Sequence, residues 1–204
     1  MKKILVPSLI ALAIGSLASV AQAQTAPEST LSYNAGVVSD YRYRGISQSR
    51  FDPALQGGVD YADKSGFYVG AWGSTIKWIK DTPGVTAGST ELDLYGGYKG
   101  TAGDFAYDMG FLRYEYAGNK LANVENYVNA NTNEIYGAVT YGLFTAKYSH
   151  AISNLFGFAE SKNSGYLDLS AALDLGDGYS LVPHVGHQSV KGAGNSKFSY
   201  TDYA

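Results

Sequence analysis

The sequence contains no cysteine, and only 16% of its 204 residues are charged. The missing cysteine excludes disulfides as the stabilising device. A soluble helical enzyme would carry more leucine, glutamate and lysine. The chain instead has 25 glycines and 18 tyrosines, and this composition disfavours an α-helical globule.

Long apolar runs and dense basic clusters are also lacking. Beyond residue 23 no apolar segment reaches the roughly 20 residues that a spanning helix needs, which excludes a polytopic helical membrane protein. The net charge is -3 and no cluster of lysine and arginine could contact a phosphate backbone, so no nucleic-acid partner is expected. The hydrophobic content of 45% is too high for a disordered chain.

The first 23 residues have the pattern of a secretory signal peptide. Lys2 and Lys3 give a basic start, residues 4–20 are apolar, and small residues at positions 21 and 23 form a cleavage site. An uncleaved anchor is the alternative, but polar residues follow at once. We expect cleavage after Ala23, which leaves a domain of residues 24–204 with 13 basic and 18 acidic side chains.

From residue 31 onward the hydrophobic pattern has period two, which predicts β-strands. Residues 165–175 are the clearest case, with leucines on one face and polar residues on most of the other. Nine strands are predicted, with a tenth starting near Tyr200. Their ranges are 32–44, 54–62, 67–77, 91–99, 105–116, 133–141, 144–152, 165–175 and 179–189.

The connections between these strands alternate between short and long. Short turns near residues 64–66, 101–104, 142–143 and 176–178 alternate with longer loops. In an antiparallel sheet all the short turns then lie at one end. This arrangement, with tilted strands of about ten residues and abundant tyrosine, is typical of an up-and-down transmembrane β-barrel of the outer membrane.

Soluble sandwiches and lipocalin-like barrels also have period-two strands and remain the alternative. Two features favour the membrane barrel: the regular alternation of connections, and aromatic residues near strand ends, where membrane-interface girdles lie. The expected girdle residues are Tyr33, Tyr41, Tyr43, Trp78, Tyr114, Tyr116, Tyr141 and Tyr179.

Three stretches resemble the TorF family of porin-like proteins of Gram-negative bacteria. They are residues 37–49 (VVSDYRYRGISQS), 53–61 (PALQGGVDY) and 65–72 (SGFYVGAW), and residues 91–98 and 133–136 also fit. The resemblance implies a signal peptide, an outer-membrane barrel of about a dozen strands, a pore role and no catalytic residue. It also leads us to expect two or three further strands after Ala204.

If the apolar face contacts lipid, the opposite face lines the lumen. Strand parity places eight acidic and four basic side chains there: Asp40, Arg42, Arg44, Asp60, Glu91, Asp93, Lys99, Asp108, Glu134, Lys147, Asp168 and Asp174. The acidic excess predicts a weakly cation-favouring passage. The alternative is a filled, narrow barrel in which Arg42 and Arg44 pair with Asp40, Asp60 and other carboxylates.

Enzymatic and metal-dependent functions have little support. A lipid hydrolase would need a serine and a histidine on one strand face; His187 and Ser189 meet this spacing, but no third orienting residue can be named. His184 and His187 have an odd spacing, so no metal site is predicted. No cofactor is expected.

The sequence therefore predicts an exported porin-like channel of the outer membrane that passes small hydrophilic solutes or ions. Its expected partners are the lipid bilayer and those solutes. The main alternative is a non-conducting barrel with a structural or surface-interaction role, and a lipid-active enzyme ranks third. The oligomeric state has no signature in the sequence.

Overall fold

The computed structural model describes residues 29–204, so the predicted signal peptide and its cleavage site lie outside the described residues. Fourteen strands and two short 3₁₀ helices are present in this range. The strands are β1 (Thr30–Val38), β2 (Arg42–Tyr43), β3 (Ile46–Ser47), β4 (Ala54–Ala62), β5 (Phe67–Thr75), β6 (Thr90–Ala102), β7 (Phe105–Tyr116), β8 (Thr132–Tyr141), β9 (Phe144–Ala151), β10 (Gly165–Ala171), β11 (Leu173–Gly176), β12 (Tyr179–Leu181), β13 (His184–Ser189) and β14 (Tyr200–Tyr203). The 3₁₀ helices are η1 (Leu121–Asn123) and η2 (Ser196–Phe198).

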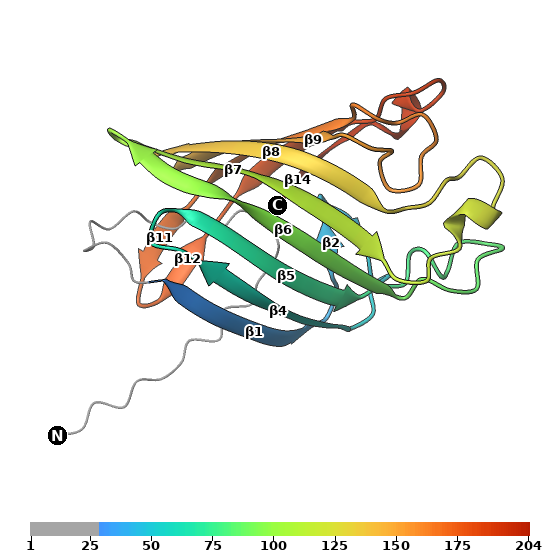
Figure 1. The fold of residues 1–204 in the computed structure, drawn as a ribbon, viewed down its shortest axis with the longest axis horizontal. Coiled ribbons are helices and arrows are strands. Elements are labelled where there is room, and N and C mark those ends of the chain that lie inside the picture. Colours follow the sequence, from blue (N-terminus) through green and yellow to red (C-terminus); the bar gives the residue numbers. More distant parts are fainter. Residues whose placement is uncertain (1–28) are drawn as a thin grey trace.

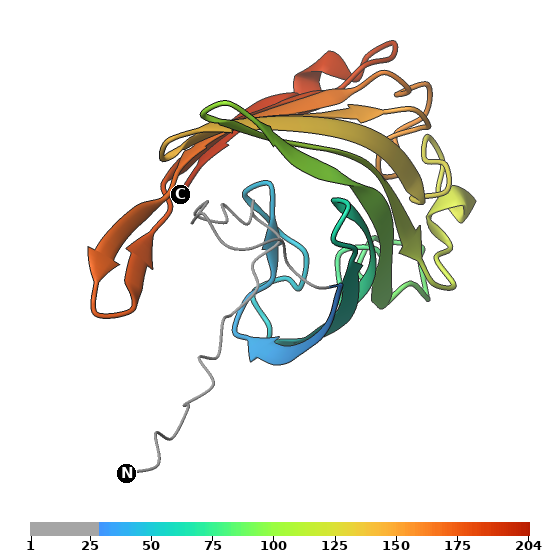
Figure 2. The ribbon, with the colours of Figure 1, turned by 60° about the vertical axis from the view of Figure 1, so that its left-hand side comes forward.

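Ten strands form one antiparallel sheet in the order β1-β4-β5-β6-β7-β8-β9-β10-β13-β14 (Figure 1). Each strand pairs with the next sheet strand along the chain, so the predicted all-β, up-and-down architecture is confirmed. β1 and β14 are the edges of this sheet. The sheet curves strongly around an interior that side chains and one inward-folded hairpin occupy (Figure 2).

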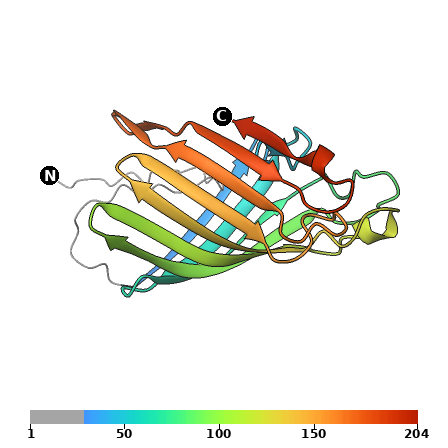
Figure 3. The ribbon, with the colours of Figure 1, turned by 90° about the horizontal axis from the view of Figure 1, so that it is seen from above.

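The two ends of the sheet differ as the sequence predicted. Tight turns and the small β11–β12 hairpin lie at one end, which we call the turn end. The long connections 39–53, 76–89, 117–131, 152–164 and 190–199 lie at the other, which we call the loop end (Figure 3). Among residues 29–204 no helix combines the length and apolar character that crossing a membrane requires.

The predicted first strand, 32–44, is too long. β1 ends at Val38, the chain bends at Ser39 and Asp40, and β2 and β3 form a separate two-stranded hairpin. We call residues 39–49 the inward hairpin, because it folds into the concave side of the sheet (Figure 2). Its turn is formed by Arg44 and Gly45, both with positive φ, as tight two-residue hairpin turns require.

The predicted strands 165–175 and 179–189 are each interrupted. β10 ends at Ala171 and β13 begins at His184, and between them β11 and β12 form a hairpin of their own. Pro183 has no N–H to donate to a ladder, which favours a break at this point. Its carbonyl instead accepts a hydrogen bond from the Ala171 N–H at 3.1 Å. This bond lies next to the break and continues the pairing of β10 with β13.

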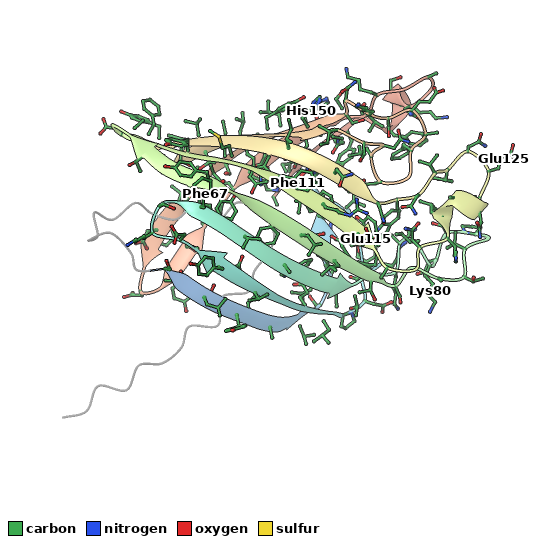
Figure 4. The ribbon with its side chains drawn as sticks, viewed as in Figure 1. Phe67, Lys80, Phe111, Glu115, Glu125 and His150 are labelled. Atoms are coloured by element: carbon green, nitrogen blue, oxygen red, sulfur yellow. The ribbon has the colours of Figure 1, made fainter. Side chains whose placement is uncertain are left out.

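The two faces of the sheet have opposite character. The outer face exposes large apolar side chains from every main strand, including Leu94, Met109, Val139, Leu169 and Val185. Phe67 and Phe111 stand on this face in Figure 4, whereas Lys80 and Glu125 belong to the loop end. The inner face carries the buried polar residues.

The structure divides the predicted girdle residues into an exposed group and a buried group. Tyr33, Tyr141 and Tyr179 are exposed on the outside, as interface residues would be. The other five predicted girdle residues belong to an interior cluster at the loop end: Tyr41, Tyr43, Trp78, Tyr114 and Tyr116. They point inward because the inward hairpin and loop 76–89 bring apolar side chains into the concave side, where the tyrosines pack against them.

Candidate functional site

The candidate site is the inner face of the sheet together with the inward hairpin. Eight of the twelve predicted lining residues lie on main-sheet strands with the predicted parity: Asp60, Glu91, Asp93, Lys99, Asp108, Glu134, Lys147 and Asp168. Glu91, Asp93 and Glu134 are buried, Asp60, Asp108, Lys147 and Asp168 are half-buried, and Lys99 is exposed. The structure thus gathers carboxylates and amines from β4 and from β6 to β10 on one curved surface.

The remaining four predicted residues lie elsewhere. Asp40, Arg42 and Arg44 belong to the inward hairpin and not to a main strand. Asp174 lies on β11, off the main sheet, and its carboxylate accepts the Gly176 N–H at 2.9 Å at the turn end. These four therefore have local or cross-barrel roles that strand parity alone could not reveal.

Arg44 at the tip of the inward hairpin makes the central polar contacts of the interior. Its Nη1 and Nη2 donate to the two carboxylate oxygens of Glu134 on β8 at 3.0 and 2.8 Å. Nη1 also donates to Oε1 of Gln188 on β13 at 2.9 Å, and Tyr200 of β14 donates its hydroxyl to the Arg44 carbonyl at 3.0 Å. The hairpin, which starts beside β1, is thereby bonded to strands from the other half of the sheet.

Aromatic rings surround the Arg44 guanidinium. Its carbon lies 4.5 Å from the ring centre of Tyr166 and 4.9 Å from that of Tyr43, distances typical of cation–π contacts. Burial disfavours the charged guanidinium, but the Glu134 carboxylate outweighs it and raises the pKa of Arg44 well above its usual range. Arg44 therefore stays charged and forms a bidentate pair with the Glu134 carboxylate.

Both arginines pair with carboxylates, as the filled-barrel alternative expected, but the partner of Arg44 is not Asp60. Arg42 pairs with Asp40 at 2.7 Å, as predicted. Arg44 does not pair with Asp60, because the inward hairpin carries it across the interior to Glu134. Asp60 instead accepts a hydrogen bond from the Tyr95 hydroxyl.

Asp40 organises the base of the inward hairpin. Its carboxylate accepts hydrogen bonds from Arg42, Ser47 and Ser49, and the Ser49 hydroxyl in turn accepts the Tyr41 N–H at 2.9 Å. Burial acts to raise the pKa of Asp40, but these three hydrogen bonds outweigh it and lower the pKa below its usual value. The serines after the turn thus hold the bend that redirects the chain inward.

Gly45 allows the hairpin tip to approach β14. Its φ is +75°, and a Cβ added there would lie 2.6 Å from the Cβ of Asp202. Only glycine combines this backbone conformation with such a close approach.

Tyrosines that lie over glycines form much of the rest of the inner face. Tyr95 on β6 passes over Gly70 on β5 to reach Asp60 on β4. Tyr166 on β10 passes over Gly186 on β13 and donates to Asp202 on β14 at 3.1 Å. In each case a ring on one strand crosses a glycine on the next and bonds to a carboxylate on the third.

A related contact joins β5 to β8. Tyr68 on β5 and Tyr136 on β8 extend toward each other over Gly97 and Gly110, and their hydroxyls are hydrogen-bonded. Tyr68 also donates to Asp108 at 2.6 Å. Tyr68, Tyr95 and Tyr136 were not among the lining residues predicted from the sequence. Tyr95 could have been predicted, because it has the same strand parity as Asp93.

The basic side chains of the inner face rest on these rings. Lys99 Nζ lies 4.7 Å from the Tyr68 ring centre and 3.8 Å from Asp108, and Lys147 Nζ lies 4.4 Å from the Tyr136 ring centre. On the C-terminal side, His184 Nδ1 lies 2.9 Å from Asp168 Oδ2. The inner face is therefore a network of charged and phenolic groups, which suits contact with water and ions.

No catalytic arrangement is formed around the histidine and serine that share a face on β13. His187 Nδ1 lies 2.9 Å from the Thr201 hydroxyl, and no hydrogen bond joins it to Ser189. Within the part of the chain that the structure describes, no group of three or more histidine, cysteine, aspartate or glutamate residues could hold a metal ion.

The comparisons with known proteins give one match. A search of curated proteins and a search of solved structures each returned no match. A family model described as "Bacterial protein of unknown function (Gcw_chp)" matches residues 22–204, which is nearly the whole chain. The chain belongs to this bacterial family, Gcw_chp.

Proposed function

We propose that this protein is a porin-like channel of the outer membrane, exported by a cleaved signal peptide, that lets small hydrophilic solutes or ions diffuse passively. The observation that carries the proposal is the division of the sheet into two faces. Large apolar side chains are exposed on the outside of every main strand, while ionisable groups and tyrosines lie inside. In water such an outer surface would be a large exposed apolar patch, whereas in a bilayer it is the contact with lipid.

The inward hairpin gives this channel a constriction. It enters the interior from the loop end and is bonded to β8, β13 and β14 through Arg44. A passage is then bounded on one side by the hairpin and on the other by the charged inner face. The likeness of residues 37–49 to the TorF porin-like proteins falls on this same hairpin.

The charges favour cations. Arg44 neutralises Glu134, and Lys99 lies near Asp108, but the partly exposed Asp60 and Asp168 have no lysine or arginine ion-pair partner among residues 29–204. Fixed carboxylates in a narrow aqueous passage act within the Debye length, about 10 Å at 0.1 M salt, and raise the local cation concentration. We therefore propose a weak cation preference that fades at high salt.

A salt-gradient recording of the full-length protein in a planar bilayer tests the proposal. We expect current with a reversal potential of cationic sign, reduced in a D60N/D168N variant. E115Q is the matched control, because Glu115 pairs with Arg113 on the outer face and should leave the selectivity unchanged. Anion preference would contradict the proposed selectivity.

A non-conducting barrel is the second candidate, and one observation favours it. At the loop end the interior is packed with Tyr41, Trp72, Ile79, Tyr114 and other buried side chains. If this cluster closes the lumen, a correctly folded protein will be silent in the same recording. That result would replace the channel with a structural or surface-interaction role.

A further inference from the structure

Two buried carboxylates beneath the inward hairpin have almost no hydrogen-bond partners. Glu91 and Asp93 are each 1% exposed and lie on the inner face of β6, two residues apart. The Tyr41 hydroxyl donates to Glu91 Oε1 at 2.9 Å. Glu91 Oε2 and both carboxylate oxygens of Asp93 have no partner among the described residues.

The charges around them do not balance. Glu134 is neutralised by its bidentate pair with Arg44, and no lysine, arginine or histidine within residues 29–204 forms an ion pair with Glu91 or Asp93. Ionised together, they would place two negative charges in a region where an uncompensated charge is very costly. Either a proton or a bound ion must then compensate them.

A shared proton does not account for the arrangement. Two carboxyl groups that share a proton are joined by a hydrogen bond, and the structure gives none between Glu91 and Asp93. A proton on Asp93 alone would create a donor that needs an acceptor, but neither Asp93 oxygen has a hydrogen-bond partner. A bound cation would instead compensate the charge and give the unpartnered oxygens a contact.

We propose that Glu91 and Asp93 bind a divalent cation of the calcium class in the interior, beneath the inward hairpin. The two unit charges match one divalent ion, and oxygen is the only donor atom the two side chains offer, which favours a hard cation over a soft one. Two carboxylates supply up to four ligand oxygens and leave the remaining positions to water. Calcium accepts such a flexible, mixed set, whereas magnesium demands a stricter octahedron.

The neighbouring side chains provide a direct probe. In the sheet register Asp93 lies between Trp72 and Tyr114, and Glu91 lies between Ser74 and Tyr116. A terbium ion in a calcium site emits when a nearby indole or phenol absorbs and transfers its excitation. Terbium bound at this site is therefore expected to luminesce on aromatic excitation.

The experiment uses the full chain folded in a neutral detergent micelle, which offers no anionic headgroup to the ion. We expect saturable, aromatic-sensitised terbium luminescence that calcium displaces. D93N and E91Q should each weaken the affinity by at least about tenfold, because each removes a charged ligand. E115Q is the matched control, since Glu115 is a carboxylate that lies on the outer face and pairs with Arg113.

A second readout keeps the proposal falsifiable if a variant folds differently. Calcium should raise the melting temperature of the wild-type protein, and this shift should be absent in D93N and retained in E115Q. Luminescence that is equal in wild type and D93N would overturn the proposal. So would potassium at matched ionic strength stabilising the protein as much as calcium does. Neither result depends on whether the barrel conducts.

Discussion

At the scale of single residues, Arg44 connects parts of the molecule that are far apart in the sequence. Its side chain bonds to Glu134 and Gln188, and its carbonyl accepts a hydrogen bond from Tyr200. The Arg44 and Glu134 side chains are 5% and 3% exposed. In a pair buried this deeply, removal of one partner leaves an uncompensated charge on the other.

We expect R44M to lower the free energy of unfolding by about 3–5 kcal/mol, because Glu134 keeps only the Tyr114 hydroxyl as a donor. R42M is the control: the Arg42 side chain is 55% exposed in its pair with Asp40, so the loss should be about 1 kcal/mol or less. Urea unfolding in detergent micelles measures both. The double variant R44M/E134Q should recover part of the loss, and equal losses in R42M and R44M would be inconsistent with a central role for Arg44.

The sequence predicted Arg44 as an interior residue but not its partner. Its inward position does not follow from strand alternation, because Arg44 lies at the tip of the hairpin that leaves the sheet after Val38. The pair with Glu134 depends on where the hairpin tip meets the sheet, 90 residues further along the chain. No spacing rule within a strand contains that information.

At the scale of elements, the alternation of apolar and polar residues predicted the ten sheet strands, because each strand has one exposed apolar face. The same pattern continues through residues 41–44, so it could not show that the chain leaves the sheet at Ser39. The bend depends on hydrogen bonds from Ser47 and Ser49 back to Asp40, across up to nine residues. The break at Pro183 had a local signal, since proline cannot donate to a ladder.

On the inner face, tyrosine side chains occupy the space beside glycines, where any other residue would place a Cβ atom. A Cβ at Gly110 would lie 2.7 Å from the Gly96 carbonyl oxygen and 2.6 Å from the Tyr136 hydroxyl, whereas at Gly137 it would meet nothing within 4 Å. We expect G110A to lower the free energy of unfolding by about 1–3 kcal/mol through overpacking. G137A should be neutral or slightly stabilising, because glycine weakens a strand.

Urea unfolding of the two alanine variants compares the same substitution on neighbouring strands, β7 and β8. The tyrosine network predicts that only G110A will also disturb the Tyr68–Tyr136 contact. Identical midpoints for G110A and G137A would mean that the rings adapt without cost and that the glycines do not shape the inner face.

At the scale of the whole molecule, the two faces of the curved sheet were predicted from the sequence, and the filling of the interior was not. Eight charged residues lie on main-sheet strands with the predicted parity. The inward hairpin and the loop-end cluster of Tyr41, Trp72 and Tyr114 were not predicted. Both form because the long connections pack against strands far away in the sequence, and these connections have no periodic hydrophobic pattern. The interior is therefore more occupied than strand alternation suggests.

The central claim is that the outer face contacts lipid, and spin labels along β6 test it most directly. The chain has no cysteine, so a single introduced cysteine labels one position without removing a native residue. Leu92 and Leu94 point outward, whereas Tyr95, Gly97 and Lys99 have the inward parity.

Each variant is folded into lipid vesicles, and its accessibility to oxygen, which partitions into lipid, is compared with that to a water-soluble nickel complex. We expect labels at 92 and 94 to meet oxygen and labels at 95 and 99 to favour the nickel complex, with a period of two. Accessibility to the nickel complex at every position, or no alternation, would contradict the account.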